Sequence, residues 1–519
     1  MEDNPGTGMM SNQSDNNKRI AKNTLMLYVR MLFSMIVSLY TSRVILNMLG
    51  VEDYGIYNVV GGFVSMFAII SSALSAATSR FITFELGKKD GNPGKVFSNA
   101  LFIHLVLAAI VLLAFETFGL WFLNEKMVIP EHRMPVANYV FQASVLAFII
   151  SIIGVPFTSA VIAHERMDTF AFLGVLEVVM KLVFVLFVAY APFHFDKLIV
   201  FPSLMIAMGI CIQLSYWFFC RKHFEECRCR PKFDKGYFRD MFSFSVWNFI
   251  GCTAAILKGQ GINMLLNLFF GTVINAAYGI ASTVNSAVSG FAGNFMTALN
   301  PQITKSYASG DKEYMFSLID RGSRFSFYLI LIFAIPLMLE TDHVLAIWLG
   351  DYPEYSVAFV RLMLAVSLID IISNTLITSQ NATGKIRNYQ LAVGGMLLMN
   401  FPFSYLALRL GYSPSAVFVV AMFVGVACLL LRLIFLRKMI GLSMSWFFKT
   451  VLLRILFVAL SASVIPFAVH FVMPYGWPRT LTVVAVSVVL TAFVILYAGC
   501  SRNERQSILL ALKKKLRRA

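Results

Sequence analysis

Six charged residues lie inside long apolar stretches of the sequence, where membrane-spanning helices are expected. They are the cations Arg30, Arg43, Lys181 and Lys258 and the acids Glu177 and Asp370. A charge at the centre of a transmembrane helix costs about 2.5–3.5 kcal/mol, so such a residue usually faces a cavity or a partner and serves a function. The cations outnumber the acids, which favours an anionic substrate such as a phosphate or diphosphate. We therefore predict that the four cations bind substrate and that the two acids couple transport to an ion.

Each of these residues also has a structural alternative. Lys258 has no acid within one helical turn and adjoins Gly259, which allows a local break in the helix. It could instead make a satisfied contact between two lobes. Glu177 and Lys181 are four residues apart, in the favourable order for an ion pair, and could neutralise each other. Asp370 could be a structural hydrogen-bonding group, and the two arginines could extend to the membrane surface.

The elements that must position these residues are transmembrane helices. Of the 519 residues, 58% are hydrophobic and 13% are charged, whereas roughly 25% are charged in soluble proteins. This composition excludes a soluble enzyme, a secreted disulfide scaffold and a disordered chain. Counting apolar stretches of about 20 residues predicts an all-α polytopic membrane protein with about 14 transmembrane helices. One of them is 54–79, and the uncharged stretch 259–304 is expected to divide near Gly271 into two.

The basic residues support this topology. With both termini in the cytoplasm, 31 of the 43 Lys and Arg residues fall on inner segments and 5 on outer loops. An excess of Lys and Arg on the cytoplasmic side is typical of membrane proteins. Arg432 and Arg454 lie near inner helix ends, and we expect them to snorkel to the surface. We therefore predict a multi-pass membrane protein with both termini in the cytoplasm, and the family resemblance given below implies the bacterial cytoplasmic (inner) membrane.

A weak internal repeat divides the chain. Residues 46–56 and 266–280 each read Leu-Asn, then Gly, then Tyr-Gly-Ile, about 224 residues apart. Six helices separate the copies, which predicts two six-helix lobes related by a pseudo-two-fold axis along the membrane normal, around a central cleft. The expected parts are a disordered cytoplasmic N-terminus (1–23), an N-lobe (24–220), a cytoplasmic linker (221–240), a C-lobe (241–436), two appended helices (437–500) and a basic cytoplasmic tail (501–519).

Several kinds of chemistry have no motif in this sequence. There is no GxxxxGK[ST] phosphate loop and no HExxH helix. Cys220, His223, Cys227 and Cys229 are grouped, but their spacing does not suit a zinc knuckle. The basic residues lie mostly between apolar runs, which indicates membrane topology and not nucleic-acid binding. We therefore expect no cofactor, no metal and no nucleic-acid partner.

Residues 43–57, which read RVILNMLGVEDYGIY, resemble the opening signature of bacterial polysaccharide transporters, and residues 80–87 extend the likeness. The chain is similar to Wzx-type flippases of the multidrug/oligosaccharidyl-lipid/polysaccharide (MOP) exporter superfamily. This resemblance implies a MATE-like fold and the flipping of undecaprenyl-diphosphate-linked oligosaccharide units from the inner to the outer leaflet, for O-antigen or capsule assembly. It implies as partners that lipid-linked glycan, membrane lipids and a glycan polymerase with its chain-length machinery. Cationic residues would bind the diphosphate, and only Arg43 lies within the motif.

Two other functions remain open. The first is a multidrug or organic-cation antiporter of the same superfamily, for which acids would be the essential residues. The second is a membrane glycan polymerase or ligase, although the outer loops are too short for a sizeable external domain. Otherwise the chain is expected to be a transporter and not an enzyme.

Overall fold

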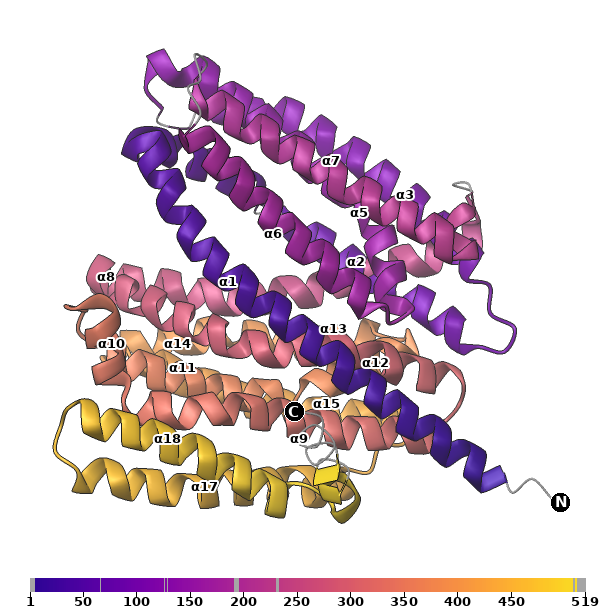
Figure 1. Ribbon diagram of the computed structural model, residues 1–519, viewed down its shortest axis with the longest axis vertical. Helices are drawn as coiled ribbons and strands as arrows, with labels where there is room; N and C mark the ends of the chain where they lie inside the picture. Colours follow the sequence, from indigo (N-terminus) through magenta and orange to yellow (C-terminus); the bar gives the residue numbers. More distant parts are fainter. Residues whose placement is uncertain are drawn as a thin grey trace. The chain divides into compact units, whose positions relative to one another are not determined.

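The computed structural model describes residues 5–65, 67–125, 127, 129–190, 196–229, 233–506 and 509–510, without the side chains of residues 5–18 and of some others in the first 70 residues and in 255–275. Within these ranges every regular element is helical (Figure 1). The chain divides into two compact units. Unit 1 comprises Met1–Cys252 and Thr304–Gly310, and unit 2 comprises Thr253–Ile303 and Asp311–Ala519.

Unit 1 contains six long helices, part of a seventh and several short elements. They are α1 (Pro5–Ser65), α2 (Ala68–Gly87), α3 (Pro93–Ala114), η1 (Phe115–Gly119), α4 (Leu120–Glu125), η2 (Glu131–Arg133), α5 (Met134–Ala163), α6 (Met167–Tyr190), α7 (Lys197–His223), η3 (Glu225–Arg228) and the start of α8 (Lys235–Ala308). Helix α5 packs against α1, α2, α3 and α7. Phe115 and Phe141 meet edge to face in this core, with ring centroids 6.0 Å apart.

Helix α8 folds back on itself although its backbone is helical over 74 residues. The Tyr278 hydroxyl donates a hydrogen bond to the Gly259 carbonyl at 3.0 Å. In a straight helix these residues would be about 28 Å apart, at 1.5 Å per residue. The reversal therefore lies between them, which agrees with the expected division of 259–304 near Gly271. Figure 1 shows α1 turning over in the same way at its far end.

The end of α2 approaches the last turn of α8 closely within unit 1. A Cβ atom at Gly87 would lie 2.8 Å from the Ala308 Cβ and 2.9 Å from the Lys305 carbonyl oxygen. Glu85 closes the following turn, since its carboxylate accepts from the Asn92 backbone at 2.9 Å and pairs with a lysine. The tight turn after α2 and its packing against α8 therefore account for the Phe84-Glu85-Leu86-Gly87 sequence.

Unit 2 contains the remaining helices. They are the later part of α8, α9 (Lys312–Leu339), α10 (Thr341–Leu349), α11 (Ser356–Ile371), α12 (Asn374–Thr383), α13 (Arg387–Leu398), α14 (Asn400–Arg409), α15 (Ala416–Ile440), α16 (Met444–Phe447), η4 (Phe448–Leu452), α17 (Leu453–Val472), α18 (Trp477–Val494) and η5 (Ile495–Gly499). Helix α15 packs against α11 to α14, and α9 packs against α11, α17 and α18. Helices α17 and α18 lie side by side (Figure 1).

A buried carboxylate ties α17 and α18 to the end of α9. Glu340 accepts hydrogen bonds from His470 Nδ1 at 2.7 Å, Thr480 Oγ1 at 2.8 Å and Arg479 Nη2 at 3.1 Å. Its burial alone would raise its pKa, but these hydrogen bonds outweigh burial and hold the pKa of Glu340 below its usual value. Polar ties of this kind matter because lipid is as apolar as the helix surfaces, so hydrophobic burial cannot hold helices together in a membrane.

The count of membrane spans differs from the prediction. Twelve helices of the described chain are long and apolar enough to cross a membrane, and a number of 14 is not confirmed. The two predicted spans not counted are 54–79, divided between α1 and α2, and the second half of 259–304 in α8. The first is apolar but is split between two helices, so neither part meets the criterion on its own. The second is helical but rich in Ser, Gly and Asn, which lowers its hydropathy.

The N-terminus also differs from its prediction as a disordered segment over 1–23. Residues 1–4 lie outside the described range, but α1 is helical from Pro5. The polar composition misled the prediction because a helix that is already nucleated adds one hydrogen bond per residue and can extend through poor helix formers.

Replacing Gly87 tests the close approach of α2 and α8. We expect Gly87→Ala to destabilise the protein by about 1–3 kcal/mol, because the added methyl group overlaps Ala308 and a backbone carbonyl. The measurement is the thermal midpoint of unfolding in detergent. Gly293→Ala is the control, since a Cβ there meets nothing within 4 Å. Equal midpoints for the two variants would contradict the packing described.

The Glu340 tie predicts a pH dependence of stability. A carboxyl whose pKa is depressed in the folded state stabilises it above the unfolded pKa of about 4.3, and this contribution is lost as the pH falls through the folded pKa. The thermal midpoint of the natural protein should therefore exceed that of Glu340→Gln at pH 6, and the difference should shrink below about pH 4. Glu354→Gln, at an exposed position, should show no such difference at any pH.

Candidate functional site

An ion pair inside the membrane-spanning part of unit 2 joins two of the predicted site residues. Lys258 of α8 places its Nζ 2.8 Å from Oδ2 of Asp370 on α11. The lysine side chain is 12% exposed, whereas the carboxylate is 43% exposed. Asp370 thus neutralises a nearly buried cation and remains accessible itself.

The helices bring these two groups together through close approaches. The Gly259 carbonyl, next to Lys258, accepts from Tyr278 where α8 folds back. On the other side a Cβ at Gly425 of α15 would lie 3.4 Å from Asp370 Oδ1. A glycine at that position therefore lets α15 approach the carboxylate closely.

Further polar groups of α13 and α15 extend this site. Arg432 donates from Nε to the Tyr389 hydroxyl at 2.9 Å. Gly425 (which approaches Asp370), Cys428 and Arg432 follow one another at i, i+3 and i+7 and so share one face of α15. We call Lys258, Asp370, Tyr389, Cys428 and Arg432 the unit 2 polar cluster. It carries two cations for one acid, so it has an excess positive charge with which it can bind an anion.

The expectation that Arg432 snorkels to the surface is wrong. Its side chain is buried, and its guanidinium bonds to a tyrosine that is also buried. The position near a helix end suggested a snorkelling arginine, but the packing of α13 against α15 encloses it. No sequence signal near Arg432 identifies Tyr389, which lies 43 residues away.

Arg30 lies against α6 in unit 1. Its Cζ is 4.3 Å from the centroid of the Phe170 ring, a cation–π distance. A Cβ at Gly174 would lie 2.1 Å from its Nε, so this glycine leaves the space that the guanidinium occupies. Arg30 and Glu177 both interact electrostatically with Tyr216 of α7. The structure thus brings these two predicted residues near one another, without an ion pair between them among the described contacts.

Two further predicted residues, Glu177 and Lys181, are not paired with each other in the structure. Among the described side chains, Glu177 and Lys181 form no ion pair within 4.0 Å with each other or with a third residue, and Glu177 is exposed on α6. The side chain of Arg43 lies outside the described residues.

The opening motif contains a structural site that the sequence analysis did not identify. Asp53 accepts a hydrogen bond from Arg133 Nε at 2.8 Å, and the same guanidinium bonds to Asp196 Oδ2 at 2.6 Å. Burial would raise the pKa of Asp196, but the bonds from Arg133 and from the Leu198 backbone hold it below its usual value. The motif therefore fixes the turn between the first two spans to η2 and to the start of α7. The sequence did contain a signal for this site, because the opposite charges of Asp53, Arg133 and Asp196 lie in short loops that are predicted on the same side of the membrane.

Within the described residues, no group of three or more His, Cys, Asp or Glu side chains could hold a metal ion. Cys220 and Cys227 lie in contact with each other, and Cys220 donates to the Phe157 carbonyl. Burial and this contact raise the pKa of the Cys227 thiol, which makes it a poor ligand and nucleophile.

Comparison with known proteins relates these features to a family. Residues 20–307 match the family described as "Polysaccharide biosynthesis protein". The sequence is 21% identical over 329 residues to the uncharacterized membrane protein EpsK of Bacillus subtilis (strain 168). That match takes in 63% of this chain and 64% of EpsK, so it spans just under two thirds of the relative's length.

Solved structures show the same fold. A MATE crystal structure in the bent conformation superposes with a TM-score of 0.71 at 12% identity, over 82% of this chain and 97% of that chain. A MOP superfamily transporter from Pyrococcus furiosus, described as having a binding pocket of reverse polarity, gives a TM-score of 0.67 at 12% identity, over 81% of this chain and 96% of that chain. The protein therefore has a MATE-like all-helical fold.

A double-mutant cycle tests the Lys258–Asp370 pair. Lys258→Gln or Asp370→Asn alone should destabilise the protein by about 2–3 kcal/mol, because each leaves one charge unpaired in the membrane. The double variant should recover most of the thermal midpoint, since no charge remains. The cycle is measured in detergent and in lipid nanodiscs, and additive losses in the double variant would show that the two groups are not coupled.

Proposed function

Because the chain belongs to the polysaccharide biosynthesis protein family, we propose that it is a MOP-superfamily flippase of the bacterial inner membrane. Its cargo is an undecaprenyl-diphosphate-linked oligosaccharide, moved from the inner to the outer leaflet for surface polysaccharide assembly. The observation that carries the proposal is the unit 2 polar cluster, in which Lys258 pairs with the accessible Asp370 while Arg432 bonds only to the neutral Tyr389. Such an excess of positive charge suits a diphosphate and disfavours a cationic drug.

Asp370 occupies the place that the substrate would take. Its carboxylate pairs with Lys258 in the substrate-free protein. A diphosphate carries more negative charge than one carboxylate and would compete for the same ammonium group. Protonation of Asp370 would release Lys258 in the same way, which links substrate binding to a proton. The absence of a GxxxxGK[ST] loop supports coupling to an ion gradient or the membrane potential.

Unit 1 supplies the other candidate residues. Arg30, held over Phe170, is a second cation for the diphosphate or the glycan, and Glu177 is a second titratable acid. Lys181 and Arg43 stay predictions of substrate contacts from the sequence. The expected partners are the lipid-linked glycan, the surrounding lipids and the polymerase with its chain-length machinery, and both termini are expected in the cytoplasm.

An organic-cation antiporter is the second candidate, supported by the MATE-like fold alone. Proteoliposomes separate the two. The antiporter would take up organic cations against a proton gradient, and its uptake would need Asp370 or Glu177 more than Lys258. The flippase would give no such uptake.

Export of the surface glycan tests the function of the polar cluster. The Lys258→Gln/Asp370→Asn double variant should remain folded and present in the membrane, yet it should reduce export at least tenfold, because the cation that receives the diphosphate is lost. The lipid-linked intermediate should accumulate in the inner leaflet. Lys438→Gln, an exposed cation at the end of α15, is the control and should export normally.

The thermal midpoint and the export of the double variant are compared, because only a stable variant shows whether the pair is needed for transport. Normal export by the stable double variant would show that the pair is only structural and would contradict the cationic mechanism. Accumulation of the intermediate in the outer leaflet would instead indicate a polymerase or ligase.

A further inference from the structure

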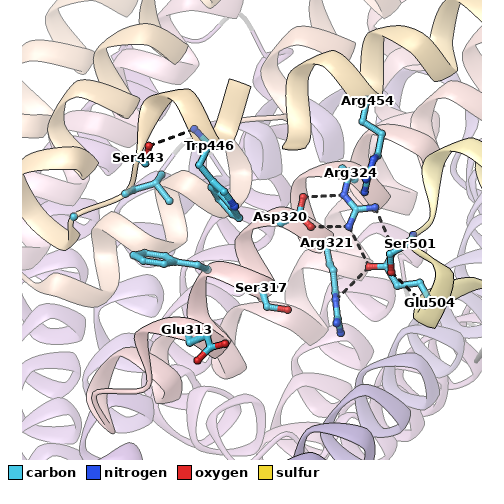
Figure 2. A pocket seen from close by; sticks show the side chains of 13 residues that line it. Glu313, Ser317, Asp320, Arg321, Arg324, Ser443, Trp446, Arg454, Ser501 and Glu504 are labelled. Atoms are coloured by element: carbon cyan, nitrogen blue, oxygen red, sulfur yellow. Dashed lines mark hydrogen bonds and ion pairs between the residues drawn. The ribbon is translucent and has the colours of Figure 1, made fainter. Parts of the chain in front are cut away.

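A cavity of about 520 Å³ lies within unit 2, where α9 begins, α15 ends and α17 begins. Figure 2 shows its lining side chains, which also come from the segment that follows η5. The distribution of Lys and Arg predicts that all these segments lie on the cytoplasmic side of the membrane. The cavity is therefore expected at the depth of the inner-leaflet headgroups, away from the unit 2 polar cluster.

One wall of the cavity is a balanced network of charges. Arg324 is 1% exposed and bonds to Asp320 at 2.7 and 2.9 Å, to Glu504 at 3.0 Å and to the Gly499 carbonyl at 2.7 Å. Arg321 pairs with Glu504 at 3.2 Å. Burial would raise the pKa of Glu504, but the two arginines and the Ser501 backbone hold it below its usual value. The two acids of this wall are thus matched by two arginines.

Two opposite charges remain at the cavity. Arg454 at the start of α17 is half-buried and Glu313 at the start of α9 is exposed, and neither has a hydrogen bond or ion pair with the part of the chain that the structure describes. In Figure 2 they lie on opposite sides of the pocket. The cavity is therefore positive on the side of Arg454 and negative on the side of Glu313.

An aromatic pair also lines the cavity. Phe316 and Trp446 line the cavity with ring centroids 6.3 Å apart. A tryptophan face attracts an ammonium group, and the nearby carboxylate of Glu313 adds to this attraction. A guanidinium binds a phosphate strongly and often through two hydrogen bonds. The two ends of the cavity thus suit the two ends of a zwitterion.

The surface next to Arg454 suits an acyl chain. Leu453, Leu456 and Phe457 of α17 are exposed and apolar. They follow the i, i+3, i+4 spacing of one helix face that begins beside Arg454. A lipid whose phosphate binds the arginine could lay its chains along this face, which a soluble phosphate compound could not use.

We propose that this cavity binds the headgroup of a phosphoethanolamine lipid from the inner leaflet. The phosphodiester bonds to Arg454, and the ammonium group lies between Glu313 and the ring of Trp446. The acyl chains extend along α17. The site is independent of the proposed flippase cargo, because none of its residues belongs to the unit 2 polar cluster.

Native mass spectrometry of the full chain from nanodiscs tests the proposal. The nanodiscs contain equal amounts of phosphatidylethanolamine and phosphatidylglycerol, and the readout is the lipid retained per protein. The natural protein should retain phosphatidylethanolamine in excess over its share. Arg454→Gln should lower the retained lipid about tenfold, as expected for a lost charge-assisted hydrogen bond. Glu313→Gln should keep lipid but lose the preference for phosphatidylethanolamine.

Controls separate this site from general attraction to the membrane. Lys449→Gln removes an exposed cation near the cavity and should leave retention unchanged, and Arg454→Lys keeps the charge if Arg454→Gln proves unstable. Equal losses from Arg454→Gln and Lys449→Gln would overturn the proposal. Displacement of the lipid by inorganic phosphate would identify a soluble phosphate site and would overturn the assignment to a lipid.

Discussion

The arrangement of this protein depends on the cost of a charge in hydrocarbon. An unpaired charge at helix centre costs about 2.5–3.5 kcal/mol, a large part of the stability of most domains. The most buried charges of unit 2 accordingly have partners on other helices. Lys258 meets Asp370, Arg432 meets Tyr389 and Glu340 meets Arg479. Each of these contacts fixes two helices to one another, so the polar residues determine the packing that apolar side chains alone would leave open.

Helix α9 shows how this works along a whole span. Near the middle of α9, Arg324 holds the Gly499 carbonyl and Glu504, which follow α18. At the end of α9, Glu340 holds His470 of α17 and Arg479 of α18. The outer faces of α17 and α18 are exposed and apolar, and lipid satisfies them as well as protein would. Besides the packing of α9 against α17 and α18, charged contacts from the middle and from the end of α9 therefore attach the two appended helices to unit 2.

The sequence allowed the fold class to be predicted because hydropathy and the distribution of Lys and Arg depend on local composition. It also identified Lys258 and Asp370 as costly charges. Their pairing could not be predicted, since 112 residues separate them and the contact depends on how α8 reverses. Arg432 was misjudged for the same reason. A position near a helix end suggests snorkelling, but only the packing of α13 and α15 decides whether the arginine reaches water. The small polar residues in the later part of α8 likewise lower its hydropathy without preventing a helix.

In the proposed transport cycle, the pairing of Lys258 makes it better suited to bind a substrate. A lysine without a partner would remain an unpaired buried charge whenever no substrate is bound, and the protein would bear the full free-energy cost of burying it. Asp370 removes this cost, and its exposed carboxylate can leave when a diphosphate arrives. The exchange replaces one ion pair with another, so the substrate needs only to interact better with the lysine than the aspartate does. The excess charge of Arg432 supplies such a difference, because it attracts the doubly charged group more strongly than the single carboxylate. A paired cation next to an unmatched one can thus be stable when empty and selective when occupied.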